Sequence, residues 1–279
     1  KITTKSKSDI HTFVLRSNSS LIETMHITLG TPYAICEKGR RPNNEDAIYP
    51  SSQTIARSQQ RLFIVCDGVG GAEKGEIASS LACESFQTFF STFIEKDATD
   101  ELIQKAVQYT EIRFDEYLSI HPEAEGMATT LTMLYFGNKG VTAAHIGDSR
   151  IYQFRDGKPV FRTEDHSLVN FWIKTGKITQ EEALHHPQKN IITRAITGSA
   201  NPTEADIAFL TDIQPDDCFL MCTDGVTECL PDNDLSSLFI RPCMPEKVKD
   251  TLVETCYEKA RDNYSFYLLP VLKVQNSSS

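Results

Sequence analysis

Acidic residues stand at the ends of several strand-like apolar runs, or in the turns beside those runs. They are Glu45, Asp46, Asp67, Asp148, Asp224 and Asp262. Taken singly, each is more simply a turn residue, because Asp-Gly is a common turn dipeptide. Taken together, they offer the oxygen ligands that Mg²⁺ and Mn²⁺ prefer. Strand ends that converge on one edge would hold such ligands rigidly, so the pattern indicates a divalent-cation site.

The overall charge is consistent with a cation site and argues against binding to nucleic acid or to anionic lipid. The chain has 279 residues, a net charge of −10 and a pI near 5.2. A general affinity for nucleic acid or for anionic lipid needs a basic face, so we expect neither partner. Apolar residues make up 40% of the chain, which is ordinary for a globular protein with a core.

The cysteines and the apolar runs bear on the compartment. None of the eight cysteines forms a Cys-x-x-Cys pair, which argues against a zinc ribbon or a thioredoxin-like motif. We interpret them as reduced, mostly buried thiols. No apolar run reaches the length of a membrane span, and no apolar signal core follows the basic N-terminus. We therefore expect a cytoplasmic monomer.

Strands are predicted from short apolar runs and from turn signals between them. Residues 131–136 and 141–146 flank a Gly-Asn-Lys-Gly turn, and residues 151–154 and 159–161 flank Asp156-Gly157. Further strands are expected at 62–66, 219–222 and 266–274, where Pro270 suggests an edge or a bulge.

Helices are predicted between these strands. Apolar residues recur at helical spacing over 76–90 and 102–118, the latter with Asp97 or Thr99 as the N-cap. Thr179 to Glu182 form a capping box, and a late helix spans 248–260. Hairpin-linked strands with helix pairs favour an α+β domain with antiparallel sheets. We place that domain at 26–274, after an N-terminal tail or peripheral strand (1–25) and before a polar tail (275–279).

In order along the chain, these motifs resemble the PP2C-type (PPM) metal-dependent Ser/Thr protein phosphatases, above all their compact bacterial branch. The resemblance covers about Tyr33 to Val274. It rests on the motifs at residues 41–46, 67–71, 75–79, 126–131, 147–150, 165–167, 186–187, 193–195, 223–225 and 262–263. It implies a four-layer αββα sandwich of two antiparallel β-sheets flanked by antiparallel helix pairs, with two metal ions at one end.

The resemblance also implies a role for each acidic residue. Asp67 would bridge two Mn²⁺ or Mg²⁺ ions, and a weaker third ion would lie near Asp148 and Asp224. Glu45 and the Gly68 carbonyl would complete one core site, and Asp224 and Asp262 the other. Asp46 would orient bound water, and Arg41 would hold the substrate phosphate.

The implied reaction is hydrolysis of phosphoserine and phosphothreonine in proteins, with a metal-bridging water as nucleophile. Phosphorylated proteins would be the substrates and a Ser/Thr kinase the functional partner. Residues 165–187 match the family's variable flap beside the active site. Arg150, Arg194 and His145 are better interpreted as structural residues, and His166, beside the flap, is also more simply a structural residue than a functional one.

Three positions depart from the family pattern, and two other readings stay open. Val69 stands where some members carry a histidine proposed as general acid, Glu228 replaces a common Asp, and Ser265 replaces a common Thr. Metal-bound water would then serve as the acid. The competing readings are a pseudophosphatase, which the complete acidic set disfavours, and a divalent-metal nuclease, which the absence of a basic stripe disfavours.

Overall fold

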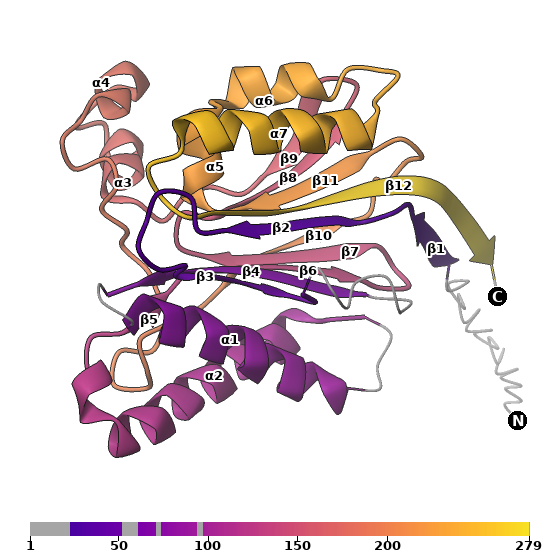
Figure 1. Cartoon of the computed structure of the whole chain (residues 1–279). Coiled ribbons are helices and arrows are strands. Elements are labelled where there is room, and N and C mark those ends of the chain that lie inside the picture. Colours follow the sequence, from indigo (N-terminus) through magenta and orange to yellow (C-terminus); the bar gives the residue numbers. More distant parts are fainter. Residues whose placement is uncertain (1–22, 52–60, 71–73, 94–96, 279) are drawn as a thin grey trace, which may run out of the picture.

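The computed structural model describes residues 23–51, 61–70, 74–93 and 97–278. Within these residues the strands form two antiparallel sheets of six, stacked face to face (Figure 1). Sheet one has the order β1-β12-β11-β8-β9, with β2 beside β12, and sheet two has the order β10-β7-β6-β4-β3, with β5 beside β4. The strands of sheet one are β1 (Glu23–Leu29), β2 (Tyr33–Glu37), β8 (Arg150–Arg155), β9 (Lys158–Arg162), β11 (Cys218–Cys222) and β12 (Tyr264–Ser278). Those of sheet two are β3 (Asp46–Tyr49), β4 (Leu62–Val69), β5 (Ala128–Thr129), β6 (Leu131–Phe136), β7 (Val141–Ile146) and β10 (Asp206–Leu210).

Helices cover both outer faces of this sandwich. Sheet two is covered by α1 (Lys74–Ser91) and α2 (Asp100–Ile120), which is followed by the short 3₁₀ turn η2 (Pro122–Ala124). Sheet one is covered by α5 (Asp224–Cys229), α6 (Asp232–Leu238) and α7 (Pro245–Lys259). The short helices α3 (Leu168–Lys174) and α4 (Gln180–Leu184) project beside one end of the sandwich (Figure 1).

The core has three apolar layers, one between each pair of neighbouring structural layers. One lies between α1, α2 and sheet two, one between sheet one and α5 to α7, and one between the sheets. In the middle layer Phe63 contacts Phe136 and Tyr267 edge to face, with ring centroids 5.8 and 5.4 Å apart. This is the favoured geometry for aromatic pairs. The predicted αββα architecture is therefore confirmed.

Local signals fix several element ends. Thr99, not Asp97, caps α2, because its side chain accepts a hydrogen bond from the Leu102 N–H, while Asp97 accepts one from Lys139 instead. The capping box at Thr179 and Glu182 opens α4 as predicted. In the β8–β9 hairpin, Asp156 and Gly157 both have positive φ, as a tight turn that matches strand twist requires.

The chain ends differ from the expectation. β12 runs to Ser278, so residues 275–278 are strand and not the expected polar tail. They are held in the strand because β1 pairs antiparallel with them, from Glu23 opposite Ser278 to Ile27 opposite Val274. The expected N-terminal segment is therefore a strand from Glu23 onward, and residues 1–22 lie outside the described part. No helix in the described residues has the length and apolarity to cross a bilayer.

Candidate metal centre

Asp67 lies near the end of β4 and pairs directly with Asp46 on β3. Its backbone is fixed by Thr130: the Asp67 N–H donates to Thr130 Oγ1 at 3.0 Å, and the Thr130 N–H donates to the Asp67 carbonyl at 2.8 Å. The Thr129 hydroxyl donates to the same carbonyl at 2.9 Å. These bonds use only backbone atoms of Asp67, so its carboxylate is free to bind a ligand.

Gly68 permits an unusually close approach of three backbone segments. Its N–H donates to the Glu45 carbonyl at 2.9 Å. A Cβ on Gly68 would lie 1.9 Å from the Gly75 carbonyl oxygen and 2.6 Å from that of Glu45. Only glycine fits here, and the result is that Glu45, the end of β4 and the start of α1 meet at one point.

Asn263 ties the loop that carries Glu45 to the start of β12. Its Oδ1 accepts a hydrogen bond from the Glu45 N–H at 2.8 Å, and its Nδ2 donates to the carbonyls of Lys38 and Asn43 at 2.8 Å each. Asp262 immediately precedes it. The sequence marks Asn263 only as part of a motif, because its role depends on contacts more than 200 positions away.

The two adjacent arginines point to different places. Arg41 Nη2 donates to Asp262 Oδ2 at 2.6 Å, and the Arg41 side chain is 48% exposed. This hydrogen bond raises the pKa of Arg41. Arg40 Nη2 instead donates to the Glu258 carbonyl of α7 at 2.6 Å. Of the two, only Arg41 is therefore directed at the acidic group.

Asp46 is buried behind the acidic group and is only partly satisfied. Its Oδ2 accepts a hydrogen bond from the Thr223 hydroxyl at 3.0 Å. Burial raises the pKa of Asp46 and the nearby Ser265 hydroxyl partly offsets that rise, but neither Asp46 Oδ1 nor Ser265 Oγ has a partner in hydrogen-bonding geometry among the described residues. The Thr223 hydroxyl also accepts the Ser265 N–H at 3.0 Å, which orients its proton toward Asp46. A buried carboxylate oxygen without a partner is costly, and a bound cation or its water would satisfy it.

The carboxylates raise one another's pKa. Burial, followed by the charges of the other acidic residues, raises the pKa of Asp67 and Asp224 well above the usual range. Burial likewise raises the pKa of Asp46 to about 7 and that of Asp148 to about 6. Buried like charges of this kind are stable as anions only when a cation compensates them. The donor set therefore fits divalent cations.

The acidic group is wider than the site of a single ion. Among the described residues, no three of these carboxylates bring one oxygen each within 4.8 Å of one another, whereas His145, His166 and Asp206 do so with one ligand atom each. The structure thus brings Glu45, Asp46, Asp67, Asp148, Asp224 and Asp262 to one end of the sandwich as a spread cluster. It also shows a second, unpredicted cluster at the histidines.

The residues interpreted as structural have the expected partners. Arg150 makes a two-point ion pair with Asp165, at 2.7 and 2.6 Å, and Arg194 donates to Asp206 at 2.6 Å. His145 is buried, with Nε2 2.9 Å from the Glu164 carbonyl.

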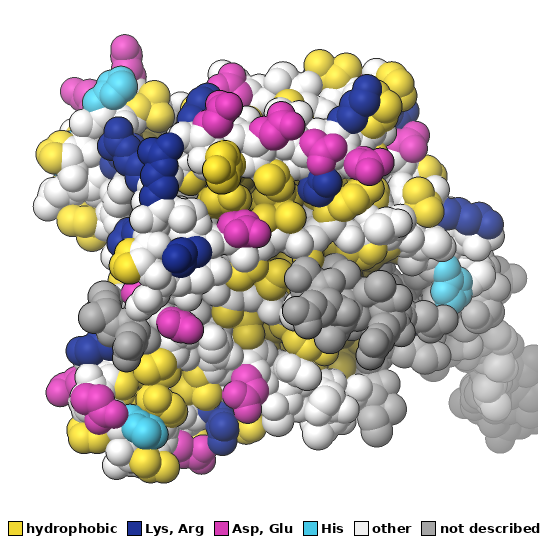
Figure 2. Space-filling model, in the orientation of Figure 1, with side chains coloured by type: hydrophobic (Ala, Val, Ile, Leu, Met, Phe, Trp, Pro, Cys, Tyr) yellow, Lys and Arg dark blue, Asp and Glu magenta, His cyan; other side chains and the backbone are white. Residues whose placement is uncertain are grey.

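On the face in Figure 2, Lys and Arg gather near the end with α3 and α4 and form no continuous stripe. Val69 is 41% exposed and carries no proton to donate.

The chain is similar to proteins of known family. A model of the protein phosphatase 2C family matches residues 39–255. The serine/threonine phosphatase stp of Listeria innocua is 31% identical over 208 residues, which cover 72% of this chain and 80% of that protein. Staphylococcus aureus Stp1 has a similar structure, with a TM-score of 0.74 and 29% identity over 89% of this chain and 98% of that one.

A further solved structure contains metal. It is the catalytic domain of the serine/threonine protein phosphatase PstP in complex with two manganese ions, with a TM-score of 0.72 and 27% identity over 90% of this chain and all of that one. The family match spans well over half of the chain, and the acidic cluster lies at one end of the same sandwich. The chain therefore belongs to the protein phosphatase 2C family and is a metal-dependent protein serine/threonine phosphatase.

Proposed function

We propose that the acidic cluster holds two Mn²⁺ or Mg²⁺ ions and that Asp67 contacts both. Glu45 and the Gly68 carbonyl complete one site, and Asp224 and Asp262 complete the other. The observation that carries this proposal is that the acidic side chains lie close enough to raise one another's pKa. The charged neighbours that raise the pKa of Asp67 are Asp46, Asp224, Asp148 and Asp262. The two manganese ions in the related PstP structure support the number of ions.

The protein's own groups bind and orient the substrate. When bound, the cations neutralise phosphate charge and make water nucleophilic near neutral pH. Arg41 lies at the exposed rim with a planar guanidinium suited to phosphate oxygens. On substrate binding its Nη groups would exchange Asp262 for phosphate, which leaves Asp262 free as a ligand. Asp46 Oδ1, which has no partner, is available to hold a water molecule in position.

Asp148 and Asp224 would share a third, weaker ion. Asp148 is the first charged neighbour that raises the pKa of Asp224, and both residues are half-buried. An ion held by few carboxylates keeps most of its waters and binds weakly. Because Val69 has no proton to give, water held near Asp148 is our candidate for protonating the leaving alkoxide.

The partners follow from the reaction. We propose phosphoserine and phosphothreonine proteins as substrates and a Ser/Thr kinase as the enzyme that supplies them. Residues 165–187, which include α3 and α4, would act as the flap beside the site. We also propose a monomer in the cytoplasm, since all eight cysteines are free, as in a reducing compartment.

The test is turnover of matched pSer, pThr and pTyr peptides with Mn²⁺ and with EDTA. Hydrolysis of pSer and pThr that requires Mn²⁺ is expected. Efficient turnover of pTyr with none of pThr would contradict the substrate proposal. A chain that binds Mn²⁺ but hydrolyses neither phosphopeptide nor p-nitrophenyl phosphate would be a pseudophosphatase. DNA and RNA incubated with the same Mn²⁺-loaded protein test the nuclease reading, and we expect no cleavage.

A further inference from the structure

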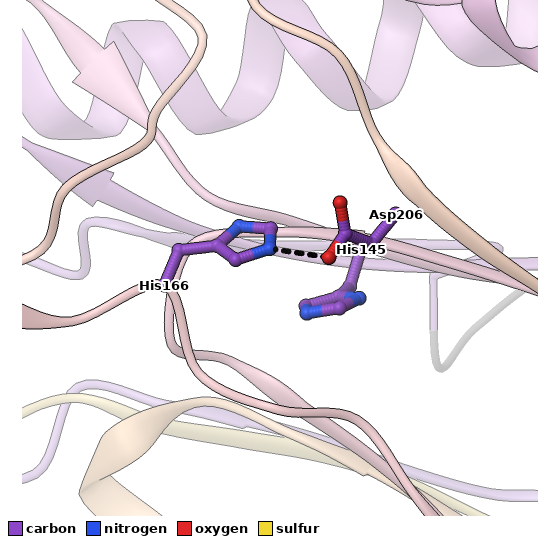
Figure 3. Close-up of side chains that lie close together, drawn as sticks. All are labelled: His145, His166 and Asp206. Carbon is purple, nitrogen blue, oxygen red and sulfur yellow. Dashed lines mark ion pairs between the residues drawn. The ribbon is translucent and has the colours of Figure 1, made fainter. Parts of the chain in front are cut away.

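Two histidines and an aspartate gather beside the turn that carries Asp148 (Figure 3). His145 lies in β7 and pairs in register with Asp206 at the start of β10. His166 stands between β9 and α3, and its ring stacks on that of His145 with centroids 4.5 Å apart. Two imidazoles and a carboxylate are a common ligand set for transition metals, so the hydrogen bonds of the cluster decide what it does.

Those hydrogen bonds leave His166 no free lone pair. Its Nδ1 accepts the Gly147 N–H at 3.1 Å, and its Nε2 lies 3.1 Å from Asp206 Oδ2. A neutral imidazole carries one proton. Arg194 Nη1 also lies 3.4 Å from Nε2, but it makes its short hydrogen bond to Asp206 instead. Because the Gly147 N–H occupies Nδ1, the proton is on Nε2, which donates to Asp206. Arg194 donates to the other oxygen of Asp206 at 2.6 Å and already supplies a cation. The cluster is therefore a hydrogen-bonded support, not a metal site.

The support acts on Gly147. While Nδ1 of His166 accepts the Gly147 N–H, the His166 backbone N–H donates to the Gly147 carbonyl at 2.9 Å. Both polar backbone groups of Gly147 are thus held by one residue. Gly147 has φ +99°, and a Cβ there would lie 2.6 Å from Thr130 Cγ2. The turn consequently has little room to adopt another conformation.

The other side of the same turn is attached to Asp67. Ser149 Oγ and Thr130 Oγ1 share a hydrogen bond of 2.8 Å, and Thr130 Oγ1 also accepts the Asp67 N–H. Asp148 lies between these two attachments. Thr130 therefore connects the turn to Asp67, and His166 holds the turn from the side of the flap.

We propose that His166 is a positioning residue for the phosphatase reaction: through Nδ1 it holds the Gly147 turn so that Asp148 lies beside Asp224. The proposal rests on the role proposed above for Asp148. His166 contacts Gly147 and Asp206 and contributes through the turn. What matters is an acceptor at the Nδ1 position, with its tautomer fixed by Asp206. Burial lowers the pKa of His166, which agrees with a neutral ring whose Nδ1 is unprotonated.

Two substitutions separate this acceptor from the rest of the ring. In His166→Asn the amide oxygen can take the place of Nδ1 and accept the Gly147 N–H. In His166→Gln the longer side chain reaches Asp206 but offers no acceptor to Gly147. We expect His166→Gln to lower kcat about tenfold with KM changed less than about twofold, since one hydrogen bond is lost near the reacting groups. His166→Asn should keep kcat within about twofold of the parent protein.

The metal-free protein supplies an independent readout. In EDTA, amide hydrogen exchange at Gly147 should accelerate about tenfold in His166→Gln and stay at the parent rate in His166→Asn. The ¹⁵N shifts of His166 in the unsubstituted protein should show a protonated Nε2 and an unprotonated Nδ1. The opposite tautomer would overturn the proposal without any variant, which matters if His166→Gln fails to fold.

Asp148→Asn completes the set and separates the two proposals. If Asp148→Asn keeps full activity, the role of Asp148 fails and the positioning role falls with it. If Asp148→Asn is impaired while His166→Gln is fully active, only the positioning role is overturned. An equal loss of kcat in His166→Asn and His166→Gln would also overturn it, because the acceptor would then not be the feature that matters.

Discussion

Asp46 on β3 and Asp67 on β4 are direct cross-strand partners in sheet two. Like charges in this position destabilise a sheet, and both carboxylates are largely buried, which adds the cost of desolvation. The pair is therefore unfavourable in the metal-free fold and favourable once a cation is bound. The dependence of stability on pH and on metal should reveal this directly.

The metal-free protein should lose stability as the pH rises from about 4 to 8. The folded-state pKa of Asp46 is raised from 3.8 to about 7, so in this range the folded state binds the proton and the unfolded state does not. The contribution is greatest below the unfolded pKa and is lost as the pH rises through 7. Between pH 5 and pH 8 this change amounts to roughly 3 kcal/mol. Denaturant unfolding in EDTA at pH 5 and pH 8 measures it.

Asp46→Asn and Mn²⁺ provide the controls for this loss. The substitution should make the decrease between pH 5 and pH 8 smaller, because the amide does not titrate, while the raised pKa values of Asp67, Asp148 and Asp224 leave part of the decrease in place. Saturating Mn²⁺ should reverse the decrease in the unsubstituted protein, since only ionised carboxylates bind the ion. His166 acts in the opposite sense below its usual pKa, so the comparison between the two proteins isolates Asp46. A parallel decrease in both would refute the assignment.

Arg41→Ala should weaken phosphopeptide binding and leave Mn²⁺ affinity equal or higher. A hydrogen bond to a charged group contributes about 1.5–3 kcal/mol, and the substitution also frees Asp262 Oδ2 from its ion pair. Arg40→Ala is the matched control, because Arg40 donates to a carbonyl of α7. Steady-state kinetics and calorimetry distinguish them. A large loss in Arg40→Ala with none in Arg41→Ala would mean that the other arginine holds phosphate.

Asp67→Asn should abolish both tight Mn²⁺ binding and turnover. It removes one negative charge from the ligand proposed to contact two cations, while its backbone bonds to Thr130 preserve the strand. The exposed Asp100→Asn on α2 serves as a control with the same chemical change. The number of tightly bound Mn²⁺ ions, from calorimetry, and phosphopeptide kinetics test both losses. Retention of two tight ions in Asp67→Asn would exclude a bridging role.

Asp148→Asn should keep the two tight ions and still reduce turnover sharply. The carboxylate belongs to a separate turn, after β7, and would share only Asp224 with the core ions. The measurement is Mn²⁺ stoichiometry together with kcat over a range of Mn²⁺ concentrations. Full activity at every concentration would make Asp148 a turn residue and remove the third ion from the proposal.

Thiol alkylation should leave activity within about twofold, while EDTA removes it. Thiolates are the reactive form, and burial raises the pKa of Cys66, beside Asp67, and of Cys222, to about 12 for the latter. Iodoacetamide treatment followed by peptide mapping and an activity assay tests this. Inhibition without unfolding would point to a thiol in the reaction, and Cys36→Ser would show whether the half-buried Cys36 is responsible.

The sequence predicts best those helices and strands that combine a regular spacing of apolar residues with a turn or a cap at their ends. The β6–β7 and β8–β9 hairpins combine apolar runs with glycine turns, and α2 has its cap at Thr99. The strands β2, β3 and β10 escape prediction because their apolar runs are only three or four residues long and their residues are mostly half-buried. The end of β12 escapes because its pairing with β1, not its composition, makes it a strand.

The residues of the site also fall into two groups, those that the sequence reveals and those that it does not. The acidic residues are visible in the sequence because their types and neighbours are distinctive. The residues that hold them in place are not visible, because Thr223 reaches Asp46 across 177 positions and Asn263 reaches Glu45 across 218. Hydroxyl and amide side chains are common, and only the fold gives them these partners.

The pairing of β1 with the last part of β12 has a mechanical consequence. Glu23 lies opposite Ser278, so the first and last described strand residues are neighbours, at the end of the sandwich away from the acidic cluster (Figure 1). Antiparallel ladder bonds run perpendicular to the strands, and a force that pulls these two positions apart therefore loads them one after another. The paired strands β1 and β12 should separate at low force, before the other strand pairs of the two sheets. The acidic end of the sandwich should then remain assembled.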